Sequence, residues 1–242
     1  MLKKHHTDNL IKLAEDRFLK NNIKNQKILK KAWLQSMYFR FYSEFELKND
    51  VIYNGDSVLS DLPETGVMFV SNCEAYQIDT MLLYRRLMTS PGYSVLEPKT
   101  NLSTLCVPET FRYLTDQRAL EYFDCIPHPA TASANISKYS TLRAIVRSLQ
   151  TGWLLNFPSP EGLNTTLSVH ASVAPFIKRI RPIIVPIHID GTKDTFGSGV
   201  RSIHNEVKKI EVTFKKPLKI DYSEHPEVIS TQISCATRSA EK

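Results

Sequence analysis

The sequence predicts an α/β fold with a mixed, largely parallel sheet flanked by helices. Its 242 residues, 42% of them hydrophobic, are enough to bury one sizeable core. From about residue 51 onward, short apolar runs alternate with helical patterns, as in α/β proteins. Before that point the pattern is helical and basic. The chain therefore divides into N-terminal helices over 1–48 and an α/β domain over 49–242.

The N-terminal segment is predicted to form two basic amphipathic helices. Ile11 and Phe18 share a helical face in the first, and Trp33 and Met37 share one in the second. Residues 1–31 hold nine Lys or Arg and three acids, whereas the other 211 residues hold 22 of each. Two interpretations stay open: helices lying in the headgroup layer of an anionic membrane, or a hairpin packed on its own domain. The absence of a zinc-finger, RNA-recognition or homeodomain signature argues against nucleic acid.

The remaining elements follow from the apolar pattern. Strands are predicted near Val67–Val70, Trp153–Phe157, Ile183–Ile189 and Lys209–Phe214. Helices are predicted near Ile78–Met88, Val107–Thr115, Ser140–Leu149 and Ala171–Arg179. The tail from Thr231 onward is rich in Ser, Thr and charge, and it is expected to be frayed.

Cysteine usage and hydropathy predict an intracellular protein without a membrane span. Cys73, Cys106, Cys125 and Cys235 form no C-x-x-C pair, have no His at metal-ligand spacing and follow no secretory leader. They are therefore expected to be reduced thiols, and no metal is implied. The longest apolar stretches, such as Ile183–Ile187, are far shorter than the ~20 residues that cross a bilayer.

Three blocks of polar or proline-rich sequence accompany the predicted strands. Residues 71–79 read Ser-Asn-Cys-Glu-Ala-Tyr-Gln-Ile-Asp, and residues 156–166 read Asn-Phe-Pro-Ser-Pro-Glu-Gly-Leu-Asn-Thr-Thr. The third block, 181–191, contains Pro-Ile-Ile-Val-Pro. In open α/β sheets ligands bind outside the carboxyl ends of the strands, so these blocks are where chemistry is expected.

In order and spacing, these blocks resemble the lysophospholipid and glycerol-phosphate acyltransferase family, over roughly residues 50–220. That family carries an Asn-His block ending in Asp before an apolar helix, then Phe-Pro-Glu-Gly-Thr-Arg-Ser, then a strand of the form Pro-Ile-Val-Pro-Val. The resemblance implies transfer of a fatty acyl group from an acyl-carrier-protein or coenzyme A thioester to a lysolipid hydroxyl. The thioester is then a substrate, and no cofactor is implied.

The block over 71–79 departs from the family at the general base. In the family a His takes the hydroxyl proton and the Asp holds the imidazole. Counting back from Asp79, four intervening residues place Glu74 at the His position and five place Cys73 there. The preceding Asn72 favours Cys73, because the family has Asn immediately before His. A thiol with an ordinary pKa of about 8.5 is mostly protonated at neutral pH and accepts a proton poorly.

Three interpretations of this departure remain open. The chain is a noncatalytic relative or an active-site variant; or Cys73 is a nucleophile that takes the acyl group as a thioester before passing it on; or a His from elsewhere enters the site. The candidate imidazoles for the third are those of His128, His170 and His188.

The resemblance places the acceptor at the second block. Glu161 and Gly162 lie where the family holds glycerol phosphate, and Asn164 and Thr165 can offer hydrogen bonds to a headgroup. The family's Thr-Arg-Ser is here Leu-Asn-Thr, so the Arg that would pair with a phosphate is absent. The acceptor is therefore expected to resemble 1-acylglycerol-3-phosphate or to be a phosphate-free lysolipid. Pro186 of the third block is assigned to the same substrate site.

The sequence thus predicts an O-acyltransferase with an altered catalytic motif, in which Cys73 and Asp79 are the catalytic residues. Its expected partners are an acyl thioester donor, a lysolipid acceptor and, through residues 1–45, an anionic membrane surface. Its expected location is the cytoplasm, peripherally on the inner face of the membrane. The alternative is a noncatalytic or active-site-variant lipid-binding member of the same family that lacks the His base.

Overall fold

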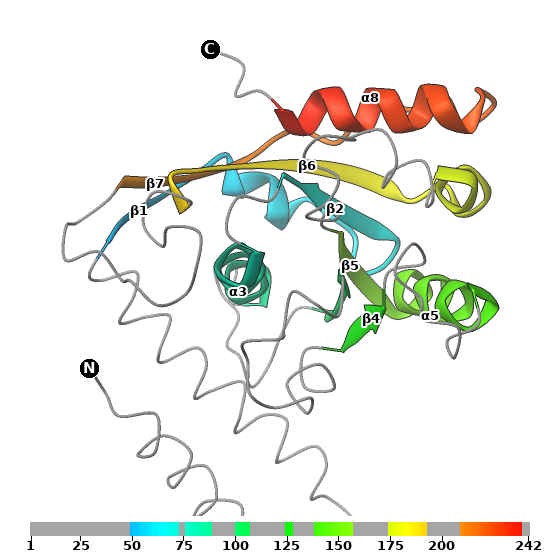
Figure 1. Ribbon diagram of the computed structural model, residues 1–242, viewed down its shortest axis with the longest axis horizontal. Helices are drawn as coiled ribbons and strands as arrows, with labels where there is room; N and C mark the ends of the chain where they lie inside the picture. The colour runs from blue at the N-terminus through cyan, green and yellow to red at the C-terminus, as the bar shows by residue number, and fades with distance from the viewer. Residues whose placement is uncertain are drawn as a thin grey trace, which may run out of the picture.

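The structure, a computed structural model, confirms the predicted α/β class. It describes residues 49–72, 76–88, 100–106, 124–127, 138–156, 174–192 and 209–238. The predicted N-terminal helices over 1–48 and the predicted helix near 107–115 lie outside the described residues. The described segments form a seven-stranded sheet with helices on both of its faces (Figure 1).

The elements alternate along the chain. In order they are β1 (Asp50–Asn54), the 3-10 helix η1 (Asp56–Ser60), β2 (Val67–Ser71), α3 (Tyr76–Met88), β3 (Asn101–Cys106), β4 (Cys125–Pro127), α5 (Lys138–Thr151), β5 (Gly152–Asn156), β6 (Ile183–Asp190), β7 (Lys209–Phe214) and α8 (Pro226–Arg238). Residues 174–180 are also helical.

The sheet is mixed but largely parallel, as the sequence predicts. Its strand order is β1-β7-β6-β2-β5-β3-β4. β6, β2, β5, β3 and β4 run in one direction, whereas β7 is antiparallel to β6 and β1 is parallel to β7. Every residue of β2 and β5 is buried, because neighbouring strands and covering helices enclose them on all sides. The four predicted strands correspond to β2, β5, β6 and β7.

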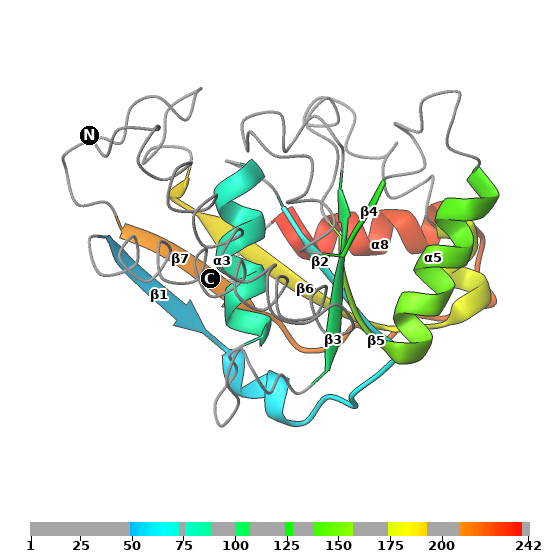
Figure 2. The same cartoon turned by 90° about the horizontal axis from the view of Figure 1, so that it is seen from below.

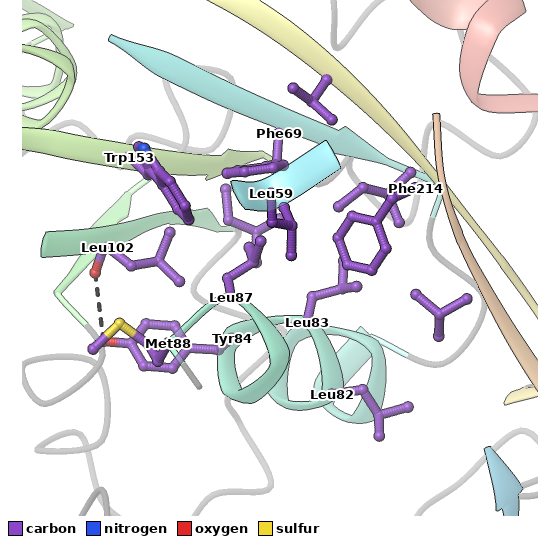
Figure 3. Packing of buried hydrophobic residues seen from close by; sticks show 14 of the residues in the cluster. Leu59, Phe69, Leu82, Leu83, Tyr84, Leu87, Met88, Leu102, Trp153 and Phe214 are labelled. Atoms are coloured by element: carbon purple, nitrogen blue, oxygen red, sulfur yellow. Dashed lines mark hydrogen bonds between the residues drawn. The ribbon is translucent and has the colours of Figure 1, made fainter. Parts of the chain in front are cut away.

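The face covered by α3 carries the larger apolar cluster. Leu83 and Leu87 of α3 pack against this face together with Leu59 of η1, as the close view shows (Figure 3). Phe69 and Trp153, from neighbouring strands, meet edge to face with ring centroids 5.2 Å apart. This cluster fixes α3 against the sheet, and with it the start of the helix beside the end of β2.

The opposite face is covered by α5, residues 174–180 and α8. Ile145 of α5, Ile177, and Ile229 and Ile233 of α8 pack against it. Seen from below, α3 lies in front of the sheet and α8 behind it (Figure 2). Among the described helices, none is both long and apolar enough to cross a bilayer.

The expectation of a frayed tail from Thr231 onward is wrong as far as Arg238, since α8 continues to that residue. Ile233, Ser234 and Thr237 are buried against the sheet. The Thr237 hydroxyl donates to the Ser234 carbonyl at 3.1 Å, which satisfies its polar atom inside the helix. Hydroxyl-bearing residues can therefore form the buried stripe of a helix, although their composition is typical of a loop.

Candidate functional site

The candidate site lies at the carboxyl edge of the parallel strands. Val70 of β2 is in register with both Asn156 of β5 and Pro186 of β6. The chain therefore leaves β2 and β5 at the same edge of the sheet and on adjacent strands. These are the starting points of the first two sequence blocks, so the structure brings together the ends from which both blocks extend.

Most predicted site residues fall beyond these ends. Five of them lie outside the described residues: Cys73, Glu161, Gly162, Asn164 and Thr165. The two that the structure describes are Asp79 and Pro186.

Asp79 is fully buried in the first turn of α3. The N-terminal turn of a helix favours a carboxylate, because the unpaired backbone N–H groups there carry partial positive charge. α3 covers the face of the sheet on which the side chain of Ser71, the last residue of β2, also lies. Only residues 72–75 separate β2 from α3. Asp79 therefore lies in the first turn of the helix that follows this short segment, to which Cys73 belongs in the sequence.

Asn72 ties the end of β2 to β6. Its Oδ1 accepts from the backbone N–H of Ile189 and its Nδ2 donates to the backbone carbonyl of Ile189, both at 2.7 Å. The side-chain amide thus acts as one more peptide group in the ladder between the two strands. Asn72 thus fixes the end of β2 against β6, whereas sequence reasoning used it only to choose between Cys73 and Glu74.

Asn156, at the end of β5, is a further residue that sequence reasoning did not select. It is fully buried, and within the described part of the chain neither Oδ1 nor Nδ2 has a hydrogen-bond partner. Its register with Val70 places it on the face opposite to α3. Buried polar groups are nearly always hydrogen-bonded, so an unpartnered carboxamide at the ligand-binding edge indicates contact with a bound polar group or water. The sequence feature that could have identified Asn156 is a polar residue at the end of an otherwise apolar strand.

We expect Asn156→Leu to stabilise the fold and to weaken function. Removing an unsatisfied buried amide should raise the free energy of unfolding by about 1–2 kcal/mol. If Asn156 contacts substrate, the acyl-transfer rate should fall at the same time. Chemical denaturation and rate measurements on the same sample test the expected rise in stability and the expected fall in rate. Thr104→Val is the matched control, because it removes a buried hydroxyl on β3 that has no partner among the described residues; it should stabilise without slowing transfer. Equal rates in both variants would exclude Asn156 from the site.

Pro186 is buried within β6. Its carbonyl accepts from the Lys215 N–H at 2.9 Å, so its nitrogen faces the β7 side, just beyond the last ladder pair, Ile187 with Phe214. A proline is tolerated there because it removes no rung of the ladder. The described contacts of Pro186 are those of a core strand residue, and its assignment to the substrate site stays a prediction.

Of the three candidate histidines, the structure describes His188. Its Nδ1 donates to the Thr237 carbonyl of α8 at 3.0 Å. His188 therefore lies on the α8 face, whereas Asp79 lies on the α3 face, and the sheet separates them. His128 and His170 are outside the described residues. Within the described ranges, no group of three or more His, Cys, Asp or Glu is placed to hold a metal ion.

One of three comparisons with known proteins finds a protein of the same fold. No family model matches the sequence, and the comparison with curated proteins finds no match. Among solved structures, the chain is similar to the 1-acyl-sn-glycerophosphate (LPA) acyltransferase PlsC from Thermotoga maritima, with a TM-score of 0.51 and 12% identity. The similarity covers 96% of this chain and 87% of that chain. At this identity it establishes that the two chains share a fold.

Proposed function

We propose that this chain is an acyltransferase that moves a fatty acyl group from an acyl-carrier-protein or coenzyme A thioester to a lysolipid hydroxyl. The observation that carries the proposal is the fold shared with an LPA acyltransferase over 96% of the chain. The fixed positions of Asn72, at the end of β2, and of Asp79, in the first turn of α3, support it. So does the adjacency of β2 and β5, from which the two sequence blocks extend.

In the proposed reaction, the acceptor oxygen attacks the thioester carbonyl carbon. A C–O bond forms, the C–S bond breaks, and the hydroxyl proton ends on the departing thiol. Cys73 takes the position of the general base, and Asp79 holds it in place. In a two-step version, Cys73 Sγ first displaces the donor thiol, which leaves with the Cys73 proton. The acceptor then displaces Cys73, which regains a proton from the hydroxyl.

The acceptor lies on the second block in this proposal. Glu161, Gly162, Asn164 and Thr165 contact the headgroup, and Pro186 contributes to the wall of the site. The headgroup is that of 1-acylglycerol-3-phosphate or of a phosphate-free lysolipid, because the family's phosphate-pairing Arg has no counterpart in this block.

Substitution of Cys73 tests the proposal. We expect Cys73→Ala to lower the rate of acyl transfer by about 10²-fold or more, the usual contribution of a positioned proton acceptor. The assay follows transfer of labelled acyl groups from each thioester donor to 1-acylglycerol-3-phosphate and to a phosphate-free lysolipid. Cys235→Ala, which removes an exposed thiol on α8, is the control and should leave the rate unchanged. A rate that survives Cys73→Ala would contradict the assigned role.

The second candidate function, a lipid-binding relative without catalysis, is favoured by the missing His at position 73. It predicts an inactive parent chain and a gain of activity in Cys73→His. The two catalytic versions also differ in a measurable way. A covalent acyl group on Cys73 raises the intact mass on incubation with thioester, and hydroxylamine reverses the increase. The one-step version gives no such increase.

We propose further that residues 1–45 attract the protein to anionic membranes. The whole excess charge of +6 lies within residues 1–31, next to a neutral remainder. Flotation with liposomes containing anionic lipid should therefore fall strongly when 1–45 are deleted, and it should fall with increasing salt. Equal flotation of the full and shortened chains would refute this role, and neutral liposomes are the control.

A further inference from the structure

A cleft of about 980 Å³ opens at the end of the sheet opposite to the candidate site. It lies between η1 and the turn that follows it, the turn before β6, and the extended segment after β7. Its walls include Ile183, the first residue of β6, and Phe214, the last residue of the antiparallel β7. In Figure 2, η1 marks this end of the sheet, where the arrow of β1 ends. The volume is within the range of small-molecule sites.

Most of the cleft is lined by apolar side chains. These are Val58, Leu62, Pro63, Pro182, Ile183, Phe214, Pro217, Leu218, Ile220 and Tyr222. Ile183 remains 38% exposed, although the rest of β6 between Ile184 and Ile187 is buried. Apolar surface left in a concave position, rather than scattered singly on a convex one, is typical of a binding groove. The lining therefore fits an alkyl chain.

Three cations are among the residues that line the cleft. Arg181, Lys216 and Lys219 all line the cleft and are exposed, whereas Asp61 is the one carboxylate among its lining residues. Within the described part of the chain, no carboxylate forms an ion pair with any of the three cations. The lining of the cleft thus carries an excess of positive charge beside apolar side chains, and an anionic group is the complementary ligand.

Arg181 occupies a backbone position that usually belongs to glycine. Its φ is 56°, and its N–H donates to the Ile177 carbonyl at 2.8 Å, which closes the helix over residues 174–180. At this left-handed C-terminal position glycine is the preferred residue, because a side chain there is strained. An interaction with Asp221 does not account for an arginine, rather than a glycine, at this position. The pKa of Asp221 is lowered first by hydrogen bonds from Ser223, and Arg181 is the smallest of the causes.

We propose that this cleft binds an anionic amphiphile with a single alkyl chain. The chain lies on the apolar floor around Ile183 and Leu218, and a carboxylate or phosphate head lies between Arg181, Lys216 and Lys219. This is a second lipid site, separated from the candidate acyl-transfer site by the length of the parallel strands. Its occupation does not depend on catalysis at the other edge.

Binding can be followed through Trp153, whose Nε1 donates to the carbonyl of Pro63 in the cleft wall at 2.7 Å. The chain has two tryptophans, so Trp33→Phe leaves Trp153 as the single emitter. The probes are decyl phosphate, decanoate, decyl maltoside and inorganic phosphate, each amphiphile below its micelle concentration. We expect decyl phosphate or decanoate to shift the emission with an affinity at least about tenfold above that of the maltoside and of free phosphate. The better of the two anionic probes identifies the headgroup. Equal binding of the neutral maltoside would overturn the proposal.

Charge variants locate the ligand. The double variant Lys216→Glu/Lys219→Glu should weaken binding of the anionic probe by about tenfold or more. Arg143→Glu/Arg147→Glu makes the same charge change on the exposed face of α5 and should leave the affinity unchanged. If both double variants bind like the parent, or both weaken binding equally, the proposal fails.

Arg181→Gly separates binding from folding. Glycine suits the left-handed conformation, so we expect this variant to unfold at a temperature no lower than that of the parent. Its affinity for the anionic probe should nevertheless fall by about fivefold, as one charged contact is lost. A weaker ligand affinity in an equally stable protein cannot come from misfolding. An unchanged affinity would mean that the amphiphile binds elsewhere. Because the readout is binding, a chain without acyl-transfer activity gives the same test.

Discussion

Asp79→Asn is expected to lower the rate of acyl transfer by about 10²-fold, as much as Cys73→Ala does, because the carboxylate acts through the group at position 73. Asp79 is fully buried at the first turn of α3, so the protein keeps a carboxyl group away from water where an amide would fill the same space. The Asp and Asn side chains have the same shape, and the interaction of the carboxylate with the helix N-terminus contributes only about 0.5 kcal/mol to the stability of the fold. The melting temperature should therefore change little. Initial rates and thermal unfolding are measured together.

Asp190→Asn is the matched control for this prediction. Asp190 ends β6 at the same edge of the sheet but is exposed, so its substitution should leave the rate unchanged. The effect of Asp79→Asn should also be measured in a Cys73→His background. If Asp79 orients the group at position 73, the loss should be larger with an imidazole there than with a thiol. Retention of the parent rate within about twofold in both backgrounds would remove Asp79 from the catalytic residues.

Asn72→Ala is expected to impair both stability and turnover. The substitution removes both hydrogen bonds to Ile189, so the N–H and carbonyl of this buried residue lose their partners. The free energy of unfolding should fall by about 2–4 kcal/mol. The rate should fall by about 10²-fold, because residue 73 then leaves the sheet without a fixed starting point. Denaturant unfolding and steady-state kinetics well below the melting temperature measure the two effects.

Two further variants separate positioning from stability. Asn101→Ala removes a similar amide contact, from Nδ2 to the Thr151 carbonyl at 3.2 Å, but at the exposed opposite edge of the sheet. Asn101→Ala should lower the free energy of unfolding by less than about 1 kcal/mol and leave kcat unchanged. Asn72→Asp keeps the acceptor for the Ile189 N–H and loses the donor, so its kcat should be intermediate. If kcat of the folded Asn72→Ala protein equals that of the parent, Asn72 serves stability alone.

The central strands could be predicted from the sequence because buried strands consist of consecutive apolar residues. β2 and β5 are covered on both faces, so their residues are continuously apolar and stand out without knowledge of their neighbours. β3, with the sequence Asn-Leu-Ser-Thr-Leu-Cys, was not predicted. Its strand conformation depends on pairing with β5 and β4, and such long-range pairing leaves little local signal. The same holds for α8, whose buried stripe includes Ser234 and Thr237.

Some residues of the candidate site could likewise be selected from the sequence, whereas others could not. The motif over 71–79 was sufficient to select Asp79, because an acid that opens an apolar helix is visible in the sequence. The role of Asn72 was not visible, since its partner, Ile189, lies 117 residues further along the chain. Nor could strand parity alone assign His188 to the α8 face, because that requires knowing which helix covers which side of β6.

The sequence by itself thus determined the α/β class, the order of the apolar strands and the blocks from which the chemistry is proposed, because these depend on residue type and local spacing. The tertiary structure alone decided which strand ends adjoin, which side chains share a face, and that a cationic cleft forms at the far end of the sheet. Those outcomes depend on the registers and packing of segments distant in sequence, whose mutual burial no local pattern encodes.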